Sequence, residues 1–323
     1  MVSVLAEPVM SNDNIKIYHE IPENNGSIVN PVVTIGNFDG VHTGHRKIIE
    51  TLLLKSREHS GEPFVITFRN HPRTVIHPGS VCRMITTVEE KQQALAALGV
   101  KNIIMLEFTR EVADLTAEQF YHELLIGRLG AREIVIGYDH AFGKNREGNI
   151  DYLNALAKRT SILITQVPVE AIDGNAVSST LLRKELDSGS MENVEKLLGR
   201  KYTFSGTVIK GEGRGRHLGY PTANVKPFSP DKIIPAGGVY AVSVNIRGKE
   251  YGGMLNIGFN PTFNGTSRSI EVNIFSFSED IYDEPLTLTF YSKIRDERKF
   301  ESAESLVRQI ESDRAQAELI LRS

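Results

Sequence analysis

Cysteine is nearly absent from this chain, because Cys82 is the single one among 323 residues. One thiol excludes an intramolecular disulfide and a zinc site built from several cysteines, and it fits a reducing cytosol. Long apolar runs are lacking as well. The mildly apolar start, from Met1 to Met10, has no basic residue and is interrupted by Glu7 and Pro8, and no later run is long enough for a membrane span. We therefore expect a soluble cytoplasmic protein with no membrane partner.

A strong charge of either sign is also lacking. The 37 Lys and Arg residues nearly balance the 40 Asp and Glu residues, which gives a net charge of -3. Such a chain has no overall field to hold a polyanion, so we expect no nucleic-acid partner, and any phosphate recognition must come from local clusters. We expect small-molecule partners, and a monomer or a weak homo-oligomer.

The length is sufficient for two domains, and the first half alternates short apolar strands with helical patterns. Expected strands cover residues 32–36, 64–68, 102–108, 133–138 and 161–167. Expected helices cover residues 44–58, 88–98, 116–129 and 149–158. Uniformly apolar strands separated by helices predict a Rossmann-like α/β domain with a parallel sheet covered on both faces. Ligands bind such sheets at the carboxyl ends of the strands.

The second half has a different pattern, which begins after two short helical segments at 178–186 and 191–198 and a helix-ending Gly199. Strands then follow one another with little helix between them, and they alternate polar and apolar residues. They cover residues 202–210, 238–246, 249–257, 269–275 and 286–292. This pattern predicts a small antiparallel barrel, followed by an amphipathic C-terminal helix that packs on it. We place the domains at 1–186 and 187–323.

The segment GNFDGVHTGH, from Gly36 to His45, lies between the first strand and the first helix. Its glycines let the backbone approach a ligand, and the helix start near Gly44 favours negative charge. His42 and His45 are three residues apart, so both can donate to the same group of oxygens from one face of the first turn. Such a pair suits attack on a nucleotide α-phosphate, which needs positioning and hydrogen bonds rather than a covalent residue.

Other interpretations of this segment stay open. The histidines could be metal ligands, although no third ligand with matching spacing is visible, or they could cap the helix and support the turn. For the carboxylate of Asp39 we favour a role in the turn or as a helix cap.

A second polar segment, VSSTLLRKEL from Val177, begins a later helix. Its hydroxyl and backbone donors at the helix start, with a fixed positive charge one turn further on, suit phosphate. The residues concerned are Ser178, Ser179, Thr180 and Arg183. Taken alone, the same residues are typical of a helix N-cap and a solvated surface arginine.

The third polar segment, GTVIKGEGRGRHLGYPTANV, opens the second half. Its glycines and arginines form a donor-rich loop, yet it lacks the G-K-[ST] ending of a P-loop, and an ordinary surface hairpin has the same composition. Thr222 and Asn224 are two apart on an extended segment, so their oxygens point the same way and can both bind a hard cation. A plain strand pair is the alternative.

Glu271 stands in an otherwise apolar strand, between Ile270 and Val272, and therefore faces away from both. If that face is solvated, Glu271 is a surface carboxylate. The alternative is a chemical role on a covered face.

The first half resembles the nucleotidyltransferase superfamily in the form found in bacterial bifunctional riboflavin kinase/FAD synthetases. Three blocks carry the resemblance: GNFDGVHTGH, IGYDHAFGKNREG from Ile136, and VSSTLLR from Val177. It implies that His42 and His45 are catalytic in FMN adenylylation. It also implies a nucleotide site formed by Gly36, Asn37, Phe38, Asp39, Gly44, Asp139, Ser178, Ser179, Thr180 and Arg183.

The second half resembles riboflavin kinases through the pattern G-R-G-x-x-L-G-x-P-T-A-N and the later blocks GVYAV, NIGFNPTF, SIEVNIF and IRDERKF. The resemblance implies that Thr222 and Asn224 bind Mg²⁺ and ATP phosphates, and that Glu271 takes the proton of the riboflavin 5′-hydroxyl. Arg295 would cover the flavin, with a plain surface arginine as the alternative. The implied nucleotide site comprises Gly211, Gly213, Arg214, Gly219, Pro221, Thr222 and Asn224.

The resemblance spans about residues 31 to 315, and four positions depart from it. They are His140 in place of Phe, Leu182 in place of Ile, Asn260 in place of Arg and Asp283 in place of Gly. The first affects packing beside the adenylyltransferase site, and the third leaves the family role of position 260 open. No departure removes a residue assigned to chemistry.

These features lead to one hypothesis, a cytoplasmic enzyme that makes both flavin cofactors in sequence. The C-terminal barrel would phosphorylate riboflavin with ATP to give FMN, and the N-terminal domain would transfer AMP from ATP to FMN, giving FAD and pyrophosphate. Both steps are expected to need Mg²⁺. The rivals are an enzyme with one active domain and a flavin- or nucleotide-binding regulator without turnover.

Overall fold

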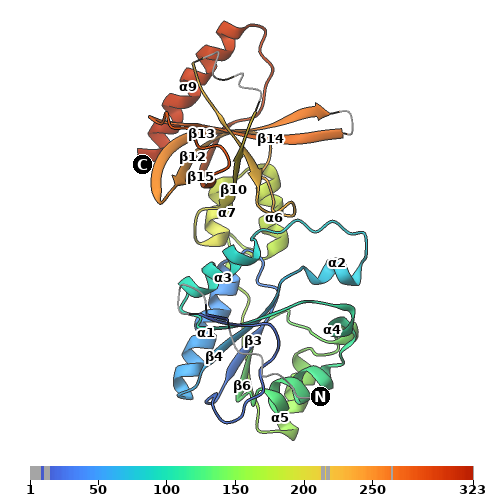
Figure 1. Ribbon diagram of the computed structural model, residues 1–323. Coiled ribbons are helices and arrows are strands. Elements are labelled where there is room, and N and C mark those ends of the chain that lie inside the picture. Colours follow the sequence, from blue (N-terminus) through green and yellow to red (C-terminus); the bar gives the residue numbers. More distant parts are fainter. Residues whose placement is uncertain (1–8, 11–14, 212–214, 216–218, 263–264, 323) are drawn as a thin grey trace. The chain divides into compact units, whose positions relative to one another are not determined.

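The computed structural model describes residues 9–10, 15–211, 215, 219–262 and 265–322. The chain divides into two compact units, Met1–Ser178 and Ser179–Ser323 (Figure 1). Each unit has its own sheet and its own core, so we describe each by itself. The division assigns the helix that follows Ser178 to the second unit, whereas the sequence-based boundary at 186/187 places it in the first.

A seven-stranded sheet forms the first unit, in the order β1-β2-β5-β4-β3-β6-β7. All neighbouring strands are parallel except β1, which pairs with β2 in the antiparallel sense. The strands are β1 (Val9–Met10), β2 (Lys16–Tyr18), β3 (Val32–Ile35), β4 (Pro63–Phe68), β5 (Asn102–Leu106), β6 (Glu133–Gly137) and β7 (Leu163–Val167). The carboxyl ends of β3, β4, β5 and β6 therefore share one edge.

Helices cover both faces of this sheet, as the uniformly apolar strands predict (Figure 1). One face packs on Ile49 and Leu52 of α1 and Leu95 of α3, and the other on Phe120 of η1 and Leu153 of α5. The helices of the unit are α1 (Thr43–Glu58), α2 (Pro72–Ile76), α3 (Val88–Ala97), α4 (Arg110–Asp114), the π-helix η1 (Glu118–Arg128), the 3-10 turn η2 (Lys144–Arg146) and α5 (Ile150–Arg159). A short hairpin, β8 (Ala171–Ile172) and β9 (Asn175–Ala176), follows β7.

The turn between β3 and α1 has an unusual backbone. Gly40 has φ 88°, and the non-glycine residues Phe38 and Val41 also have positive φ, at 49° and 42°. Left-handed conformations of bulky residues cost roughly 1–3 kcal/mol each and persist only where the surroundings enforce them. Both side chains are buried in the core, which holds the turn in this conformation.

A closed antiparallel barrel forms the second unit, in the order β10-β11-β14-β13-β12-β15. Closure leaves no free sheet edge, and the apolar residues of each strand fill the interior. The strands are β10 (Thr203–Ile209), β11 (Ala223–Pro227), β12 (Gly238–Ile246), β13 (Lys249–Thr262), β14 (Gly265–Ile274) and β15 (Pro285–Arg295).

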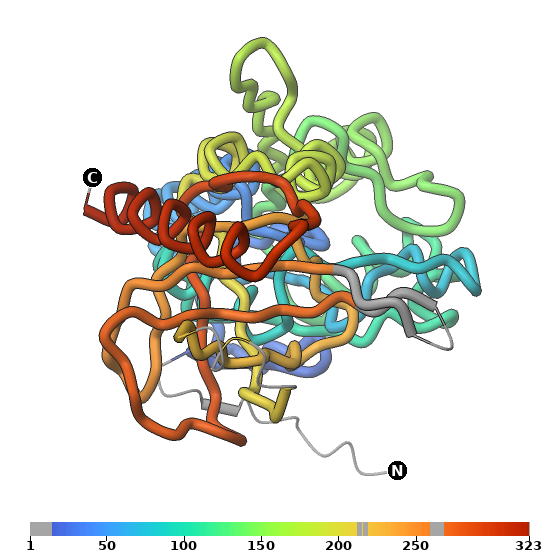
Figure 2. The backbone as a smooth tube through the Cα atoms, turned by 90° about the horizontal axis from the view of Figure 1, so that it is seen from above, coloured from blue at the N-terminus to red at the C-terminus, as the bar shows by residue number. Residues whose placement is uncertain are grey.

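The helices α6 (Ser179–Ser188), α7 (Met191–Leu198) and α9 (Ala303–Arg322) accompany the barrel. Gly199 ends α7 with φ 67°, which confirms the predicted C-cap. The long helix α9 lies along the barrel against β12, β13 and β15 (Figure 2). It buries Ala317 and packs Ile310 on the barrel strands, so the predicted apolar stripe is confirmed.

The expected fold class is confirmed in both halves, and the expected helices and strands lie within a few residues of the observed ones. The sequence reading did not anticipate the strands before residue 30, the barrel strand β11, the short helices α2 and α4, or the hairpin β8–β9. Within the described ranges, no helix combines the length and the apolar composition needed to cross a membrane.

Two candidate active sites

His42 begins α1 as its N-cap residue. Its Nδ1 accepts a hydrogen bond from the backbone N–H of His45 at 3.3 Å. An accepting Nδ1 carries no proton, so Nε2 holds the proton of the neutral ring. Gly44 makes room for this ring, because a Cβ there would lie 3.3 Å from His42 Nδ1. The cap interpretation and a role in phosphate binding are therefore compatible in one side chain.

His45 stacks on His42, with ring centroids 3.5 Å apart and an interplanar angle of 16°. Phe38 meets the other side of the His45 ring edge-on at 5.1 Å. Burial lowers the pKa of His45 well below its ordinary value, and the neighbouring His42 and Lys91 lower it further. The ring is thus neutral near pH 7. Its buried Nδ1 has no hydrogen-bond partner among the described residues, as expected of a group that awaits a ligand.

Lys91 is a site residue that the sequence reading missed. It is fully buried on α3, and its Nζ donates to the carbonyl oxygens of Asn37 at 3.1 Å and Phe68 at 2.6 Å. Burial lowers the pKa of Lys91 to about 8, and the nearby Asp39 acts in the opposite direction. Asn37 also keeps a buried side-chain Oδ1 that meets no partner in the described part of the chain.

Asp39 is fully buried. It accepts hydrogen bonds from the backbone N–H groups of Ile85 and Thr86 at 3.0 Å, and from the Thr86 hydroxyl at 3.2 Å. Thr86 Oγ1 in turn accepts from the N–H of Gly40 at 3.1 Å. The carboxylate thus ties the turn to the segment before α3, which agrees with the turn role favoured from the sequence.

A cavity of about 700 Å³ opens at the carboxyl ends of β3, β4 and β6. Its lining includes Gly36 and Asn37 of the turn, Asp139 after β6, and a basic group formed by Arg110, Lys144 and Arg146. The predicted Asp139 and the turn residues are thus brought together at one edge of the sheet, as the strand order requires. The three basic side chains are further candidates, and the sequence alone did not distinguish them from surface charge.

His140 also lines this cavity, at the position where the family pattern has Phe. Its Nε2 lies 2.6 Å from the hydroxyl of Tyr121. Burial lowers the pKa of His140 to about 4, and Arg146 contributes to the same shift. The His140 ring is therefore neutral. It stands where the family pattern has an apolar Phe ring, and it contacts Tyr121 both through the hydrogen bond and edge-on.

The helix-start residues of the second segment fall at the junction of the units. Ser178 ends the first unit, whereas Ser179, Thr180 and Arg183 lie on α6 in the second. Their joint role with the histidines stays a prediction.

In the second unit, the side chains of Thr222 and Glu271 are in contact. Thr222 Oγ1 donates to Glu271 Oε2 at 3.4 Å. The strand register also sets Asn224 of β11 opposite Glu271 of β14, and Asn256 of β13 on the other side of Glu271. A polar row thus runs across three adjacent strands, and Asn256 is the member that the sequence reading missed.

The face that carries Glu271 is covered rather than solvated. Ile270 and Val272 point into the barrel and are buried, whereas Glu271 is half-buried. Asn273, two residues on and on the same face, is also buried and donates to the carbonyl oxygen of Pro221 at 2.7 Å. The segment before β11 therefore lies over this face, which weakens the alternative of a plain surface carboxylate.

Gly211 and Asn224 lie in direct contact. A Cβ on Gly211 would come within 2.0 Å of Asn224 Nδ2, so only glycine permits this position of the amide. Gly219 has φ 83°, a left-handed conformation that favours glycine. The predicted Gly213 and Arg214 lie outside the described residues.

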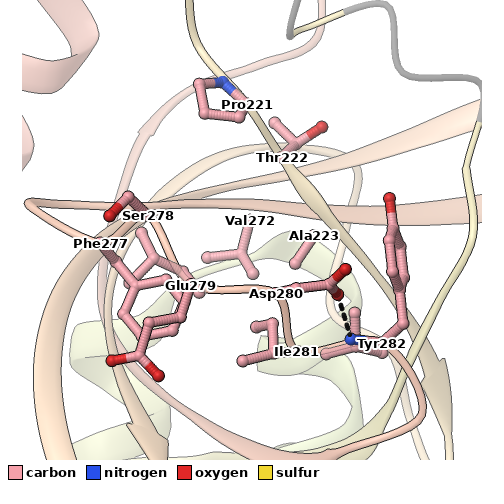
Figure 3. A pocket seen from close by; sticks show the side chains of 12 residues that line it. Pro221, Thr222, Ala223, Val272, Phe277, Ser278, Glu279, Asp280, Ile281 and Tyr282 are labelled. Atoms are coloured by element: carbon pink, nitrogen blue, oxygen red, sulfur yellow. Dashed lines mark hydrogen bonds between the residues drawn. The ribbon is translucent and has the colours of Figure 1, made fainter.

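A pocket of about 320 Å³ lies beside Thr222 (Figure 3). Its floor is apolar, with Ala223, Val272 and Ile281, and the aromatic rings of Phe277 and Tyr282 stand at its sides. This pocket could not be predicted from the sequence, because its walls come from strands and from a loop far apart along the chain.

Arg295 has a partner within the protein. Its guanidinium pairs with the buried carboxylate of Asp313 on α9, with Nη2 at 2.7 Å and Nε at 2.9 Å. This ion pair anchors α9 to β15, so an architectural role is evident. The flavin contact expected of Arg295 stays a prediction.

No group of three or more His, Cys, Asp or Glu side chains in the described ranges is arranged to hold a metal ion. The oxygen set of Thr222, Asn224 and Glu271 is of another type, because hydroxyl and amide oxygens make up most of it. Such oxygens suit a hard cation shared with substrate phosphates.

The fold and the two sites are those of a nucleotide-dependent transferase with two units. One unit is an α/β domain with a histidine-containing turn at the carboxyl edge of its sheet, and the other is a barrel with a row of polar side chains across its strands. Comparisons with known proteins agree. The family profile for FAD synthetase matches residues 26–181, and that for riboflavin kinase matches residues 198–321. The chain belongs to the family of bifunctional riboflavin kinase/FMN adenylyltransferases.

Relatives with that description cover nearly the whole chain. The protein of Listeria monocytogenes is 35% identical over 302 residues, which are 93% of this chain and 95% of the relative. That of Escherichia coli K12 is 34% identical over 283 residues, 87% and 90% of the two chains. A crystal structure described as a macrolide-efflux protein from Streptococcus pneumoniae has a TM-score of 0.84 and 32% identity, and covers 91% of this chain and 95% of its own.

Proposed function

We propose that the two units catalyse successive steps of flavin cofactor synthesis, each at the site described above. The single observation that carries the assignment is the turn from Gly36 to His45. There His45 stacks on His42 at a helix start, and His45 Nδ1 and the nearby Asn37 Oδ1 have no hydrogen-bond partner among the described residues. A helix start with such groups is suited to an anion. The barrel contributes a separate oxygen set, so each step has its own site.

In the first unit, a phosphate oxygen of FMN attacks the α-phosphorus of ATP. A new P–O–P bond forms, the bond between the α- and β-phosphates breaks, and pyrophosphate leaves. His42 donates from Nε2 to the phosphate oxygens, and His45 donates beside it. Their work is to hold the phosphates in line and to stabilise the charge that develops on them.

In the barrel, the 5′-hydroxyl oxygen of riboflavin attacks the γ-phosphorus of ATP, and ADP leaves. Glu271 accepts the hydroxyl proton as the new P–O bond forms. Thr222 donates to Glu271 at 3.4 Å and so orients the carboxylate before substrate binds. The apolar pocket between Phe277 and Tyr282 is suited to the base of ATP, because it adjoins Thr222 and offers aromatic walls.

A divalent cation fits the barrel site, and we propose Mg²⁺. Thr222 Oγ1 and the Asn224 side-chain oxygen would hold it, as hydroxyl and amide oxygens suit a hard cation. Bound there, it would neutralise charge on the ATP phosphates. We also retain cytoplasmic location and a monomeric or weakly associated state as proposals, the latter to be checked by light scattering.

Chromatography of products from riboflavin, ATP and Mg²⁺ tests the function, since FMN and FAD should both appear. His45→Ala should abolish FAD formation and leave FMN formation intact, and Glu271→Gln should do the reverse when FMN is supplied. His122→Ala and Glu301→Gln, at exposed positions, are the matched controls and should change neither step.

The two rivals give different results in the same assay. An enzyme with one active domain would give FMN without FAD, and a regulator would release no pyrophosphate. Loss of both steps in a folded His45→Ala protein would refute the assignment of sites.

A further inference from the structure

A fully buried lysine beside a candidate phosphate site needs an explanation. Lys91 is 0% exposed, although lysine is almost never buried completely unless it is paired. Its Nζ contacts two backbone carbonyls rather than a carboxylate within hydrogen-bond distance. We propose that Lys91 is a positioning residue for adenylyl transfer, which holds the turn that receives the phosphates and places a positive charge near His45. This inference rests on the function proposed above.

The two carbonyls lie where adjacent strands end. Phe68 is the last residue of β4, and Asn37 follows the end of the neighbouring strand β3. Both carbonyls lie beyond the last β3–β4 pair, Ile35 with Ile66, so the β3–β4 pairing supplies no donor for them. The ammonium of Lys91 donates to both, and Thr67 Oγ1 also donates to Asn37 O at 3.0 Å. Lys91 thereby fixes the backbone of Asn37, whose unpartnered side chain lines the cavity.

A second set of contacts holds the same turn from the same element. Asp39 accepts from Ile85 and Thr86, immediately before the N-cap of α3, and Gly40 donates to Thr86. Lys91 acts one turn inside α3. The turn between β3 and α1 is therefore held at Asn37 and at Asp39 by one helix and its leading segment. A shift of Lys91 would move the histidines relative to the cavity, and small misplacements of reacting groups slow a reaction strongly.

The charge of Lys91 has a separate effect from its hydrogen bonds. His45 is faced by His42 from the start of α1 and by Lys91 from α3, and Lys91 itself is faced by Asp39 from the turn. Both neighbours of His45 disfavour its protonation. The imidazole thus stays neutral, and the protonated Lys91 adds a positive charge that favours bound phosphates.

Lys91→Met removes both the donor and the charge while it keeps the length of the side chain. We expect the kcat for FAD formation from FMN to fall about 10- to 100-fold, the range typical of residues that orient a site indirectly. Lys91→Arg keeps the charge and should recover part of that loss. Lys101→Met, at an exposed lysine, is the control. Riboflavin phosphorylation by the same preparation should stay unchanged in every variant, which shows that the second unit is intact.

The pH dependence of FAD formation shows whether Lys91 acts through its charge as well as through its hydrogen bonds, or has a structural role alone. Since Lys91 loses its proton around pH 8, FAD formation by the parent enzyme should decline as the pH rises through that value. The decline should be absent in Lys91→Met and in Lys91→Arg, because a guanidinium does not titrate there. Kinase activity measured in the same buffers corrects for effects on ATP.

Two results would overturn the proposal. One is a Lys91→Met enzyme that forms FAD with the kcat and the pH profile of the parent, while His45→Ala, measured in parallel, forms no FAD. The other, which needs no variant, is a parent profile without a decline near pH 8. If His45→Ala itself kept FAD formation, the proposed function would fail instead, so the two failures are distinguishable.

Discussion

The two units prepare their sites in different ways. In the first, the turn after β3 has strained backbone at Phe38 and Val41 and leaves buried atoms of Asn37 and His45 without partners in the described chain. In the barrel, Thr222 and Glu271 bond to each other, and cross-strand register aligns them with Asn224. The first site therefore depends on a turn that buried charges enforce, whereas the second depends on strand pairing. A substitution in one unit should therefore impair the reaction of that unit and leave the reaction of the other unit unchanged.

The largest effect is expected for Asp39→Ala. The change removes a carboxylate that accepts from Ile85 and Thr86 and leaves Lys91 as a buried cation without its counter-charge. Leaving the two buried N–H donors of Ile85 and Thr86 without their acceptor costs roughly 2–6 kcal/mol, at about 1–3 kcal/mol for each donor. Chemical denaturation should show the first unit destabilised by about that amount and FAD formation lost, with riboflavin phosphorylation retained. Equal destabilisation of both units would contradict the comparison.

Gly211→Ala is the counterpart in the barrel. The new Cβ would meet Asn224 Nδ2 at 2.0 Å, so the amide must leave its position. We expect FMN formation to fall about 10- to 100-fold through misplacement of a substrate-binding group. FAD formation from supplied FMN should not change. A rate of FMN formation in Gly211→Ala equal to that of the parent would show that the kinase step does not depend on the position of Asn224.

The sequence sufficed to predict the features that follow from local chemistry. Alternation of apolar strands and helices gave the parallel sheet and hence the edge where the histidines lie, and the glycines of the turn indicated close approach of a ligand. The position of Glu271 between two apolar residues predicted that its side chain points to the opposite face of the strand from theirs. These properties depend on residues close together along the chain.

The sequence could not predict features that arise from long-range packing. Lys91 follows two glutamates in a polar helical stretch and looks like a solvated charge, yet the ends of β3 and β4 require a donor at that point. Arg295 likewise looked available to a ligand, because nothing local indicates that Asp313 would take its guanidinium. The partners of buried charges are set by tertiary structure, and so the contacts of these two residues could not be predicted from the sequence.

A smaller effect is expected for Tyr282→Ala at the barrel pocket. The ring forms one side of the pocket beside Thr222 and is half-exposed. Loss of an aromatic contact is worth about 0.5–1.5 kcal/mol beyond buried area, which corresponds to a rise in KM for ATP of about 2- to 10-fold. Steady-state kinetics of riboflavin phosphorylation should show this rise with little change in kcat. Tyr138→Ala, at an exposed position in the first unit, is the control; an unchanged KM in Tyr282→Ala would place the base elsewhere.

The smallest effect on activity is expected for His140→Phe, which restores the ring that the family pattern has at this position. The pKa of His140 is lowered to about 4 in the folded chain, so the unfolded chain, with a pKa near 6.5, binds the proton first. Stability of the first unit should therefore fall as the pH drops from about 6.5 toward 4. His140→Phe should remove part of that fall and change FAD formation at pH 7.5 by less than about twofold, since the ring is neutral there. Thermal melting at pH 7.5 and pH 5 measures the first effect. An equal loss of stability on acidification in the parent and the variant would show that His45, whose pKa is also lowered, accounts for the acid sensitivity of this unit.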